Sequence, residues 1–440
     1  MSWEKVKLGQ FLKVRENRFK PNDKEIAHLK RIDKIDFSGE IFVSDKPSNT
    51  DMILIKNGDL VISGINVEKG AMAIYTGKED ITATIHYSSY TFDKNSIDIE
   101  FLKFFLKSIE FKKALKEQVP GGIKTEIKPK HILPLVVNIP TDIKDQREVV
   151  KVLNNRNSKV DAISTELTHQ FALVKKLRQQ LLQDAVQGKL VEQNKKDEPG
   201  SELLNRIKAE KAKLIAEKKL KKEKELSPIK PDEIPFEIPE NWAWCKLGEI
   251  CSKIGSGSTP KGSNYSVNGI PFFRSQNIYD NGLVYDDIKF ISNEVHKKMN
   301  GTTVYAKDIL LNITGGSMGR CTLVPEDFEE GNVSQHVCII RPLVVDNNFY
   351  HYITLSPFFQ KFIFSSTTGA GREGLPKYNL EQFIIPLPPL AEQHRIVKKL
   401  EELMEYCSEL ESSIKQSESQ NEKLLQQVLR EALRKEPVED

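Results

Sequence analysis

Two glycine-rich stretches of the sequence contain residue types that could bind phosphate. The stretch GSGSTPKGS (Gly255–Ser263) is similar in composition to a nucleotide-binding loop, but such a loop needs glycine directly before its lysine and Ser or Thr directly after it. Here Pro260 precedes Lys261 and Gly262 follows it, and proline removes one of the amide donors that would surround a phosphate. The stretch ITGGSMGR (Ile313–Arg320) lacks the spacing of a dinucleotide fingerprint and is typical of a bulged turn. Neither stretch predicts nucleotide binding, and the first is either an ordinary polar loop or a loop that faces DNA.

No other group of reactive residue types forms a catalytic pattern. The motif of adenine methyltransferases, Asn-Pro-Pro-aromatic, is absent, and PLPPL (Pro386–Leu390) has its prolines without the Asn or the aromatic residue. The eight histidines are scattered, without an H-x-x-x-H or H-E-x-x-H pattern that would indicate a metal site. No spacing of carboxylates is typical of a nuclease. We therefore expect no catalytic residue, no metal and no cofactor bound by this chain.

Two segments place a histidine among small polar side chains, as the recognition of bases requires. They are ATIHYSSY (Ala83–Tyr90) and NVSQHVCI (Asn332–Ile339), whose hydroxyl, amide and imidazole groups can donate and accept hydrogen bonds. Arg31 and Arg274 occupy matching places in two parts of the chain, and arginine is the usual donor to guanine edges and phosphates. For each residue the alternative is a hydrogen bond that is satisfied inside its own domain.

Two glycine-containing loops also carry a basic residue, GGIKTE (Gly121–Glu126) and GAGREG (Gly369–Gly374). Flexible basic loops commonly contact phosphates, although many contact only water. These segments together give the predicted DNA-binding residues: Arg31, Lys34, His86, Tyr87, Ser88, Lys124, Ser256, Ser258, Arg274, Gln276, Arg320, Gln335, His336 and Arg372.

The overall composition bounds the class of protein. A chain of 440 residues is long enough for two or three domains. Its 65 Lys and Arg against 62 Asp and Glu give a net charge of only +3, so a DNA-binding surface would need its basic residues sorted onto one face. The five cysteines form no C-x-x-C pair, which favours a reducing compartment. The first residues, MSWEKVKLGQ, lack the apolar core of a signal peptide, and no apolar run is long enough to span a membrane, so we expect a soluble, cytoplasmic protein.

The elements that position the polar residues occur twice. The pattern Trp3-x-x-x-Lys7-Leu8-Gly9 recurs as Trp242-x-x-x-Lys246-Leu247-Gly248, and DQREVVKVL (145–153) recurs as EQHRIVKKL (392–400). Further matches at a nearly constant separation are Arg31, Ile35 and Gly39 with Arg274, Ile278 and Gly282, Asp59 with Asp308, Ser108 and Phe111 with Ser356 and Phe359, and Pro129-Lys130 with Pro376-Lys377. Such a colinear set indicates two copies of a unit that consists of a globular domain and a long helix.

Each long helix carries a heptad pattern. In the first, positions alternate by four and three through Leu153, Arg156, Val160, Ile163, Leu167, Gln170, Val174, Leu177 and Leu181; in the second, through Ile396, Leu400, Leu403, Cys407, Leu410, Ile414, Ser417, Asn421, Leu424 and Val428. One such helix could simply lie on its own domain, but two of them predict an antiparallel coiled coil within the chain. We expect it to pair through Leu153, Val160, Leu167, Leu177, Leu400, Leu403, Leu410 and Leu424.

The predicted fold is α+β, with two similar mixed α/β domains separated by two long antiparallel helices. Its expected parts are residues 1–144 (first domain), 145–190 (first long helix), 191–237 (a charged helical segment and a Pro-rich linker), 238–390 (second domain) and 391–436 (second long helix). Mixed-charge runs such as SELLNRIKAEKAKLIAEKKLKKEKE are usually solvated helices, so we expect one here rather than a nucleic-acid-binding arm.

With these features the chain resembles the DNA-specificity (S) subunit of type I restriction-modification systems. The resembling stretches are IPENWAWCKLGEI (238–250), IGSGSTPK (254–261), SQHVCIIRP (334–342), PLPPLAEQHRIVKKLEEL (386–403), and LRQQLLQDAVQGKLV (177–191) followed by SELLNRIKAEKAKLI. The first copy departs from this pattern, since it has TDIKDQ where the second has PPLAEQ and no glycine-serine loop after Leu8-Gly9.

The resemblance implies a non-catalytic DNA-recognition subunit. Each globular copy would be a target-recognition domain that reads one half of a bipartite DNA sequence, and the helices would set the spacer and dock modification (methyltransferase) subunits, two of them. Those subunits would bind S-adenosylmethionine and methylate adenine, and a restriction subunit would translocate and cleave DNA with ATP and Mg²⁺. The alternative is a stand-alone two-domain DNA-binding or adaptor protein without modification partners. An enzyme with a site of its own is a third class that the sequence does not favour.

Overall fold

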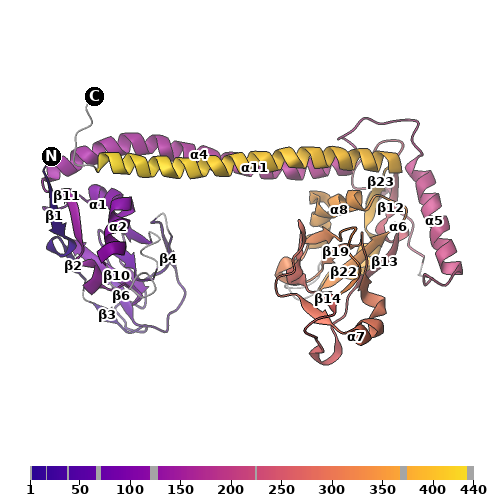
Figure 1. Cartoon of the computed structure of the whole chain (residues 1–440), viewed down its shortest axis with the longest axis horizontal. Helices are drawn as coiled ribbons and strands as arrows, with labels where there is room; N and C mark the ends of the chain where they lie inside the picture. The colour runs from indigo at the N-terminus through magenta and orange to yellow at the C-terminus, as the bar shows by residue number, and fades with distance from the viewer. Residues whose placement is uncertain are drawn as a thin grey trace. The chain divides into compact units, whose positions relative to one another are not determined.

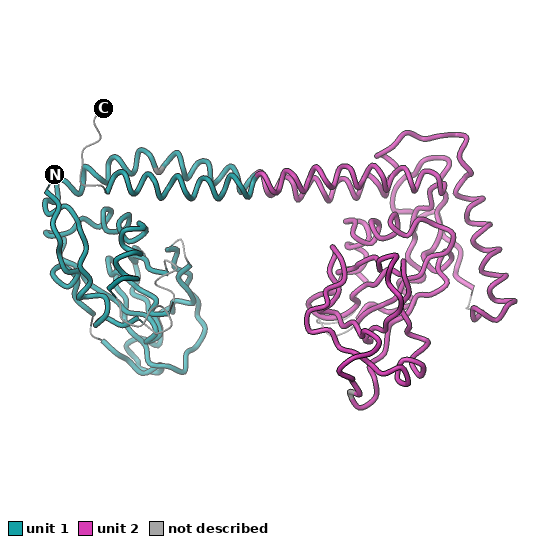
Figure 2. The backbone as a smooth tube through the Cα atoms, in the orientation of Figure 1, with its two compact units in different colours: residues 1–169, 414–440 teal, residues 170–413 magenta. Residues whose placement is uncertain are grey.

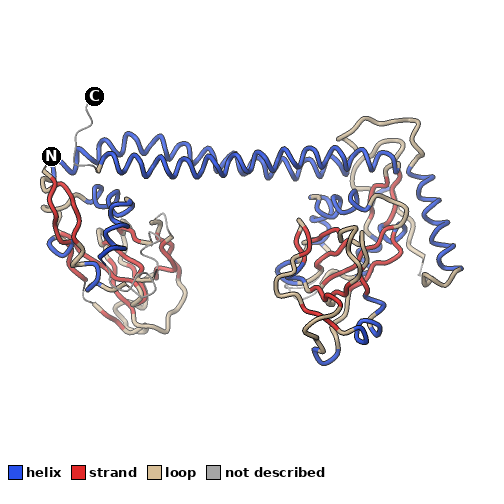
Figure 3. Tube along the Cα trace, in the orientation of Figure 1, coloured by secondary structure: helices blue, strands red, loops and turns tan. Residues whose placement is uncertain are grey.

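The computed structural model describes residues 2–15, 17–36, 39–65, 71–118, 127–222, 225–366 and 374–433. The chain divides into two compact units: unit 1 contains residues 1–169 and 414–440, and unit 2 contains residues 170–413 (Figure 2). Both units combine helices with short strands (Figure 3). No helix in the described part of the chain is long and apolar enough to cross a membrane.

In its described residues, the globular part of unit 1 contains three sheets and short helices. Strand β1 (Trp3–Lys7) pairs antiparallel with β11 (Val136–Pro140). A four-stranded sheet has the order β2 (Leu12–Val14), β10 (Tyr87–Phe92), β7 (Leu60–Ser63), β8 (Met72–Ile74), and a five-stranded sheet has the order β3 (Arg18–Phe19), β6 (Met52–Ile55), β9 (Ile81–Thr84), β4 (Arg31–Ile35), β5 (Ile41–Ser44). The helices are η1 (Leu8–Gln10), α1 (Ile99–Lys107), α2 (Ile109–Gln118) and α3 (Pro129–Ile132).

The globular part of unit 2 is built in the same way (Figure 1). Strand β12 (Ala243–Lys246) pairs antiparallel with β23 (Ile384–Leu387). One four-stranded sheet has the order β13 (Cys251–Ser256), β22 (Val337–Pro342), β19 (Ile309–Asn312), β20 (Cys321–Leu323), and the other has the order β17 (Lys289–Ile291), β14 (Ile270–Phe273), β21 (Gly331–Val333), β18 (Thr303–Val304). Further elements are the hairpin β15 (Ile278–Tyr279) and β16 (Gly282–Leu283), the helices α6 (Leu247–Ile250), α7 (Asn293–Lys298), α8 (Asn347–Leu355), α9 (Pro357–Ser365) and α10 (Lys377–Gln382), and the short 3-10 helices η5 (Lys261–Ser263), η6 (Ser275–Asn277), η7 (Asn300–Thr302) and η8 (Gly315–Ser317).

The two globular parts share one topology, which confirms the internal repeat. The sheet order β2-β10-β7-β8 corresponds strand by strand to β13-β22-β19-β20. The parallel pair of β4 and β9 corresponds to that of β14 and β21, with antiparallel neighbours on both sides. Buried serines stand at the same helix junction: the Ser108 hydroxyl donates to Phe105 O and accepts from Phe111 N (2.6 and 3.2 Å), and the Ser356 hydroxyl bonds Ile353 and Phe359 likewise (2.6 and 3.3 Å).

Helices α4 (Ile143–Val186) and α11 (Leu390–Ala432) pair with each other in both units. In unit 1 the Asn421 side chain donates to Val160 O (3.0 Å), and Arg156 lies 3.1 Å from Glu431. These contacts run in opposite chain directions, so the helices are antiparallel there, as the sequence predicts. In unit 2 the Arg178 guanidinium donates to Glu411 (2.9 Å). The end of the pair in unit 1 joins the domain core, where Val149, Leu153, Val428, Leu429 and Leu433 pack with the buried side chains of α1.

The helices bury a narrower seam than the heptads suggest. Nearly buried residues recur once per heptad, at Leu153, Val160, Leu167, Val174 and Leu181 in α4 and at Leu400, Cys407, Ile414, Asn421 and Val428 in α11. The second apolar position of each predicted heptad lies largely outside the buried seam. Leu177, Leu410 and Leu424 are 43%, 49% and 44% exposed, and Leu403 is half-buried. This corrects the expected pairing of those residues. A heptad pattern gives the apolar face of a helix, but it does not tell which half of that face the partner helix covers.

The charged segment after α4 is not simply a solvated helix. Helix α5 (Gly200–Ala216) buries Leu203 and Ile207 completely, and its Lys211 ammonium donates to Gly248 O of α6 (2.7 Å). Gly200 allows this close packing, since a Cβ there would lie 2.1 Å from Leu387 O. The expectation of solvation is corrected because two apolar residues, four positions apart, hold one face of this helix on the globular part of unit 2.

Candidate nucleic-acid interface

In unit 2, backbone hydrogen bonds bring four polar segments together at the ends of strands. The segments are the chain after β13, the turn after β14, the turn after β19 and the turn before β22. The bonds that join them are Ser258 N–H to Val333 O (3.1 Å), Ser334 N–H to Phe273 O (3.0 Å) and Ile313 N–H to His336 O (3.0 Å). Predicted residues from distant parts of the sequence, Ser258, Arg274 and His336, therefore flank one surface.

The glycine-serine stretch forms one edge of this surface. Gly257 has no room for a side chain, because a Cβ there would lie 1.9 Å from Val333 O. The backbone can therefore pass close to β21 while Ser256 and Ser258, on either side, are exposed. The second glycine of GSGSTPKGS thus serves a close backbone approach, and its serine hydroxyls are accessible at the interface.

His336 is held between two polar side chains. Its Nδ1 lies 2.7 Å from the Thr314 hydroxyl, and its Nε2 lies 3.3 Å from the Gln335 amide nitrogen. The Gln335 amide oxygen in turn accepts from the Thr259 hydroxyl. Gln335 and His336 are both exposed, so this network fixes their orientation while leaving polar edges that can donate or accept.

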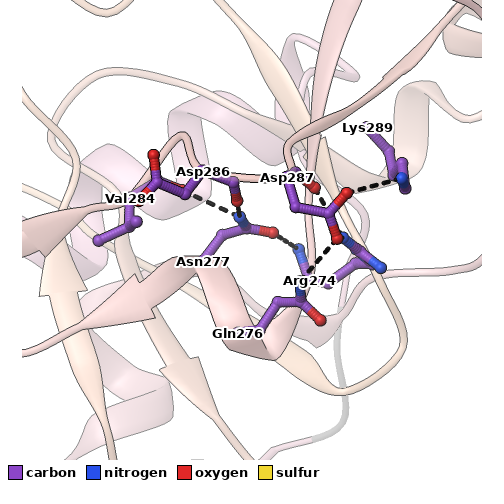
Figure 4. Close-up of polar contacts among 7 residues, drawn as sticks. All are labelled: Arg274, Gln276, Asn277, Val284, Asp286, Asp287 and Lys289. Carbon is purple, nitrogen blue, oxygen red and sulfur yellow. Dashed lines mark hydrogen bonds and ion pairs between the residues drawn. The ribbon is translucent and has the colours of Figure 1, made fainter. Parts of the chain in front are cut away.

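Arg274 and Gln276 already have acceptors inside their domain (Figure 4). The Arg274 guanidinium donates to the Asp287 carboxylate (2.9 Å) and to the Asp287 carbonyl (2.7 Å), and Gln276 donates to the same carboxylate (3.2 Å). Hydrogen bonds from Lys289 (2.8 Å) and Arg274 lower the pKa of Asp287 to about 2. Buried Asn277 holds the loop, since its side chain accepts from Arg274 N (3.0 Å) and donates to Val284 O (3.0 Å).

Arg320 is the remaining described candidate of unit 2. Its guanidinium stacks over the ring of Tyr279, 4.8 Å from the ring centroid. Both side chains remain accessible in part. A stacked guanidinium keeps its donors in the plane of the group, where they can reach a phosphate or a base edge.

Unit 1 has the same backbone path at the corresponding place. Gly64 N–H donates to His86 O (2.8 Å) as Ile313 N–H does to His336 O, and Ile127 N–H donates to Gly64 O (2.8 Å) as Leu375 N–H does to Ile313 O (2.9 Å). His86 and His336 therefore hold equivalent positions in the two copies. The predicted Lys124 and Arg372 lie outside the described residues.

A pocket of ≈ 550 Å³ lies beside His86 in unit 1. It gathers the predicted residues His86, Tyr87 and Ser88, and burial raises the pKa of Tyr87. It is also lined by basic and amide side chains that the sequence analysis missed: Arg15, Asn17, Arg18 and Lys128. The internal repeat could have identified Arg15, Asn17 and Arg18, because VRENRF (14–19) follows Leu8-Gly9 much as IGSGST (254–259) follows Leu247-Gly248.

Arg31 and Lys34 are outside that pocket. Arg31 stands in β4 and donates to Pro47 O (3.3 Å), with Asp33 at 3.9 Å. Arg274, its match in the sequence repeat, instead follows the end of β14. Lys34 lies over the ring of Phe42, 4.6 Å from the ring centroid. The pocket thus gathers the histidine-centred candidates of unit 1, whereas Arg31, whose charge acts on Tyr87, and Lys34 stand outside its lining.

In the described part of the chain, potential metal ligands are dispersed and the thiols are buried. No group of three or more His, Cys, Asp or Glu side chains there could hold a metal ion. The five cysteines are free and buried, and burial raises the pKa of the Cys321 and Cys338 thiols to about 12, so neither forms a thiolate near neutral pH.

The chain is similar to known proteins in both sequence and fold. The family model of the type I restriction modification DNA specificity domain matches residues 239–417. The specificity subunits of the Escherichia coli type I restriction enzymes EcoAI and EcoEI are 34% and 36% identical over 54% of this chain, and the matches cover 41% and 40% of their own lengths. The chain therefore spans about two fifths of these relatives. The specificity subunit of the Methanocaldococcus jannaschii type I restriction enzyme MjaVIII is 22% identical over 91% of this chain and 86% of its own.

One solved structure shares the fold over nearly the whole chain. It is described as the structural basis of complex assembly and conformational transition of the type I R-M system, and it superposes with a TM-score of 0.58 at 18% identity over 98% of each chain. The likeness at this identity concerns the arrangement of helices and strands. This likeness of fold includes the first copy, which lies outside the residues that the family model matches.

Proposed function

We propose that this chain, which belongs to the specificity-subunit family of type I restriction-modification systems, reads a bipartite DNA sequence for partner subunits. The globular part of unit 1 reads one half of the target and that of unit 2 reads the other. The chain performs no chemistry itself. S-adenosylmethionine, ATP and Mg²⁺ are bound by the modification and restriction subunits that it directs.

The observation that carries this proposal is the duplicated interface. His86 and His336 stand at equivalent positions in two domains of one topology, on the same path of backbone hydrogen bonds. A single binding site would need one copy of this arrangement. Two copies whose side chains differ, within one chain, suit a target with two different halves.

The side chains at the two interfaces favour different readout. Unit 2 presents the neutral hydroxyl and amide groups of Ser256, Ser258 and Gln335 beside His336, and an amide pairs well with the Hoogsteen edge of adenine. Unit 1 presents Arg18 and Lys128 beside His86, and such cations suit guanine edges and phosphates. We therefore expect a guanine contact in the half read by unit 1.

The long helices offer a surface for partner subunits. Large apolar side chains are exposed along them, namely Leu173, Leu177, Tyr406 and Leu410 in unit 2 (47%, 43%, 55% and 49%) and Val152, Ile163 and Leu424 in unit 1 (43%, 44% and 44%). Exposed apolar side chains that line up along a surface often mark a protein–protein contact. We propose that helices of two modification subunits pack there, and that the lengths of α4 and α11 set the number of unread base pairs.

Mapping of methylated adenines tests the function directly. The chain is expressed with a modification subunit of the same system in a host that lacks other methyltransferases, and the genome is sequenced with detection of methylated bases. The expected result is one motif made of two short halves with a fixed spacer. Replacing residues 1–140 by the corresponding domain of a relative should change one half only. A continuous motif, or a change in both halves, contradicts the proposal.

A further inference from the structure

Gln146 and Gln393 stand at matching places in the first turns of α4 and α11, and both side chains are completely buried. They belong to the repeated phrases DQR and EQH. A fully buried glutamine is uncommon, because each polar atom of its amide must find a partner. Two partners of each amide correspond between the copies, and Gln146 Nε2 makes one further bond, to Ser96 O (3.3 Å).

Each amide joins three segments of its own unit. In unit 1, Asp98 N–H donates to Gln146 Oε1 (2.7 Å), and Gln146 Nε2 donates to Pro140 O (2.8 Å) at the end of β11. In unit 2, Asp346 N–H donates to Gln393 Oε1 (2.9 Å), and Gln393 Nε2 donates to Pro388 O (2.9 Å) just after β23. In each unit, the last strand of the domain, the start of α1 or α8 and the start of the long helix thus meet at one glutamine side chain.

The aspartates in this joint make further bonds through their carboxylates. Asp98 caps α1 by accepting from Glu100 N (3.0 Å), and its other oxygen lies 3.4 Å from Arg147. Asp346 caps α8 by accepting from Asn348 N (2.9 Å) and lies 2.7 Å from His394. The residue after the glutamine, Arg147 or His394, therefore adds a second bond between the long helix and the domain. This residue differs between the two copies, but its partner is an aspartate in both.

None of these residues lines the candidate nucleic-acid interface. Their hydrogen bonds fix the angle between a reading domain and its long helix, because the amide bonds both partners at once and is shielded from water. The rise per base pair along one strand is about 3.4 Å. A small rotation at the joint, carried through the domain, is therefore enough to move the reading surface by one base pair.

We propose that Gln146 and Gln393 are positioning residues that make the subunit selective for the length of the unread spacer, separately from the side chains that read bases. The inference rests on the proposed function. It predicts that loosening a joint broadens the range of spacers accepted and leaves both half-site sequences unchanged.

The test uses the complete chain in complex with its modification subunits. A DNA library carries the two half-sites of the wild-type motif separated by spacers from shorter to longer than the natural one, and methylation of each member is measured. For Gln393→Leu and, separately, Gln146→Leu, the preference for the natural spacer over one base pair more or less should fall roughly three- to tenfold, as expected from the loss of buried hydrogen bonds. The sequence preference within each half should stay as in the wild type.

Matched controls separate positioning from stability. Gln416→Leu changes an exposed glutamine on the same helix α11 and should retain the wild-type spacer preference. Gln393→Met fills a similar volume without hydrogen bonds. This variant is used in the test if Gln393→Leu does not assemble with the modification subunits. A folded variant that reads both halves and accepts only the natural spacer overturns the inference.

The outcomes distinguish this inference from the proposed function. If the wild-type complex recognises no bipartite motif, the proposed function itself fails. If the wild type reads such a motif and the joint variants retain its single spacer, only the role of the two glutamines is refuted. Variants that lose one half-site sequence while keeping the spacer would assign the glutamines to base reading and likewise refute the positioning role.

Discussion

Arg341 holds Asp308 through two parallel hydrogen bonds of 2.6 Å, and the carboxylate is 1% exposed. The equivalent carboxylate of unit 1, Asp59, is held in the same bidentate way by Arg15 at 2.6 and 2.7 Å. Arg341 comes from β22, whereas Arg15 follows β2, the edge strand of the corresponding sheet. The two copies have thus kept the buried anion and satisfy it from different strands.

Replacing Arg341 by methionine should destabilise unit 2 strongly. The Asp308 carboxylate would remain buried without its cation, and loss of one partner of a buried ion pair costs about 3–5 kcal/mol. Burial already raises the pKa of Asp308, against the opposing effect of Arg341, so the variant should regain stability as the pH falls and the carboxyl takes up a proton. Urea unfolding at several pH values measures this. The double variant with Asp308→Asn should be more stable than Arg341→Met alone, and a single variant as stable as the wild type would contradict the assignment.

His351 should make unit 2 sensitive to acid. Burial lowers the pKa of its imidazole from 6.5 to about 4, so the unfolded chain binds a proton at a higher pH than the folded one. The neutral imidazole contributes stability that is fully present above pH 6.5 and is lost as the pH falls toward 4, by up to about 3 kcal/mol. Unfolding free energies at pH 7 and pH 4.5 measure the loss. In His351→Gln this pH dependence should be smaller, and an equal slope in both proteins would rule out His351 as its source.

Two neighbouring glycines, Gly255 in β13 and Gly257 just after it, should respond differently to alanine. Gly257→Ala would bring a Cβ to 1.9 Å from Val333 O, whereas a Cβ at Gly255 meets no atom within 4 Å. The first substitution must displace the backbone that carries Ser256 and Ser258, so we expect loss of the half-site read by unit 2 with the other half retained. Gly255→Ala should bind as the wild type does. Binding to DNA that carries both halves or only one half separates these outcomes.

Substitution of one base-reading side chain in each unit should relax one half-site at a time. Gln335→Ala is expected to cost about 1–3 kcal/mol of discrimination at a single base pair read by unit 2. Arg18→Ala should relax a guanine position in the other half, since within the described chain Arg18 is exposed and has no ion-pair partner. Competition binding with single-base variants of the target measures both. A uniform loss across all sequences would identify Arg18 as a phosphate contact instead.

Much of the architecture could be predicted from the sequence because duplication leaves a signal in position as well as in residue type. Ser108 and Ser356, or Gln146 and Gln393, are matched pairs in the sequence, and the members of each pair have hydrogen bonds in common. Such matches predicted the repeat and the long helices without reference to their contacts.

The side-chain partners could not be predicted in the same way. Arg15 and Arg341 lie at different distances from their aspartates in the sequence, so no spacing reveals that both serve the same role. Arg274 was predicted as a base reader from its residue type, and its Nη2 donates to Asp287, an acceptor in the left-handed region (φ 51°) that a sequence pattern does not reveal. Arginine and lysine side chains are long and flexible, and only the folded chain decides between an internal acceptor and DNA.

Leu410 offers a test of the surface proposed for partner subunits. Its side chain is 49% exposed, whereas Ile414, four residues later on α11, is 7% exposed in the pairing seam. Leu410→Glu should therefore leave the helix pair folded, because the carboxylate stays hydrated, and should abolish co-purification with the modification subunit by placing a charge in an apolar contact. Ile414→Glu should instead lower the unfolding temperature of the isolated chain, since it buries the charge between α4 and α11. Circular dichroism on heating and affinity co-purification measure the two effects. If Leu410→Glu retained the partner at wild-type yield, the exposed stripe would not be the docking surface, and the partner would have to bind elsewhere on the chain.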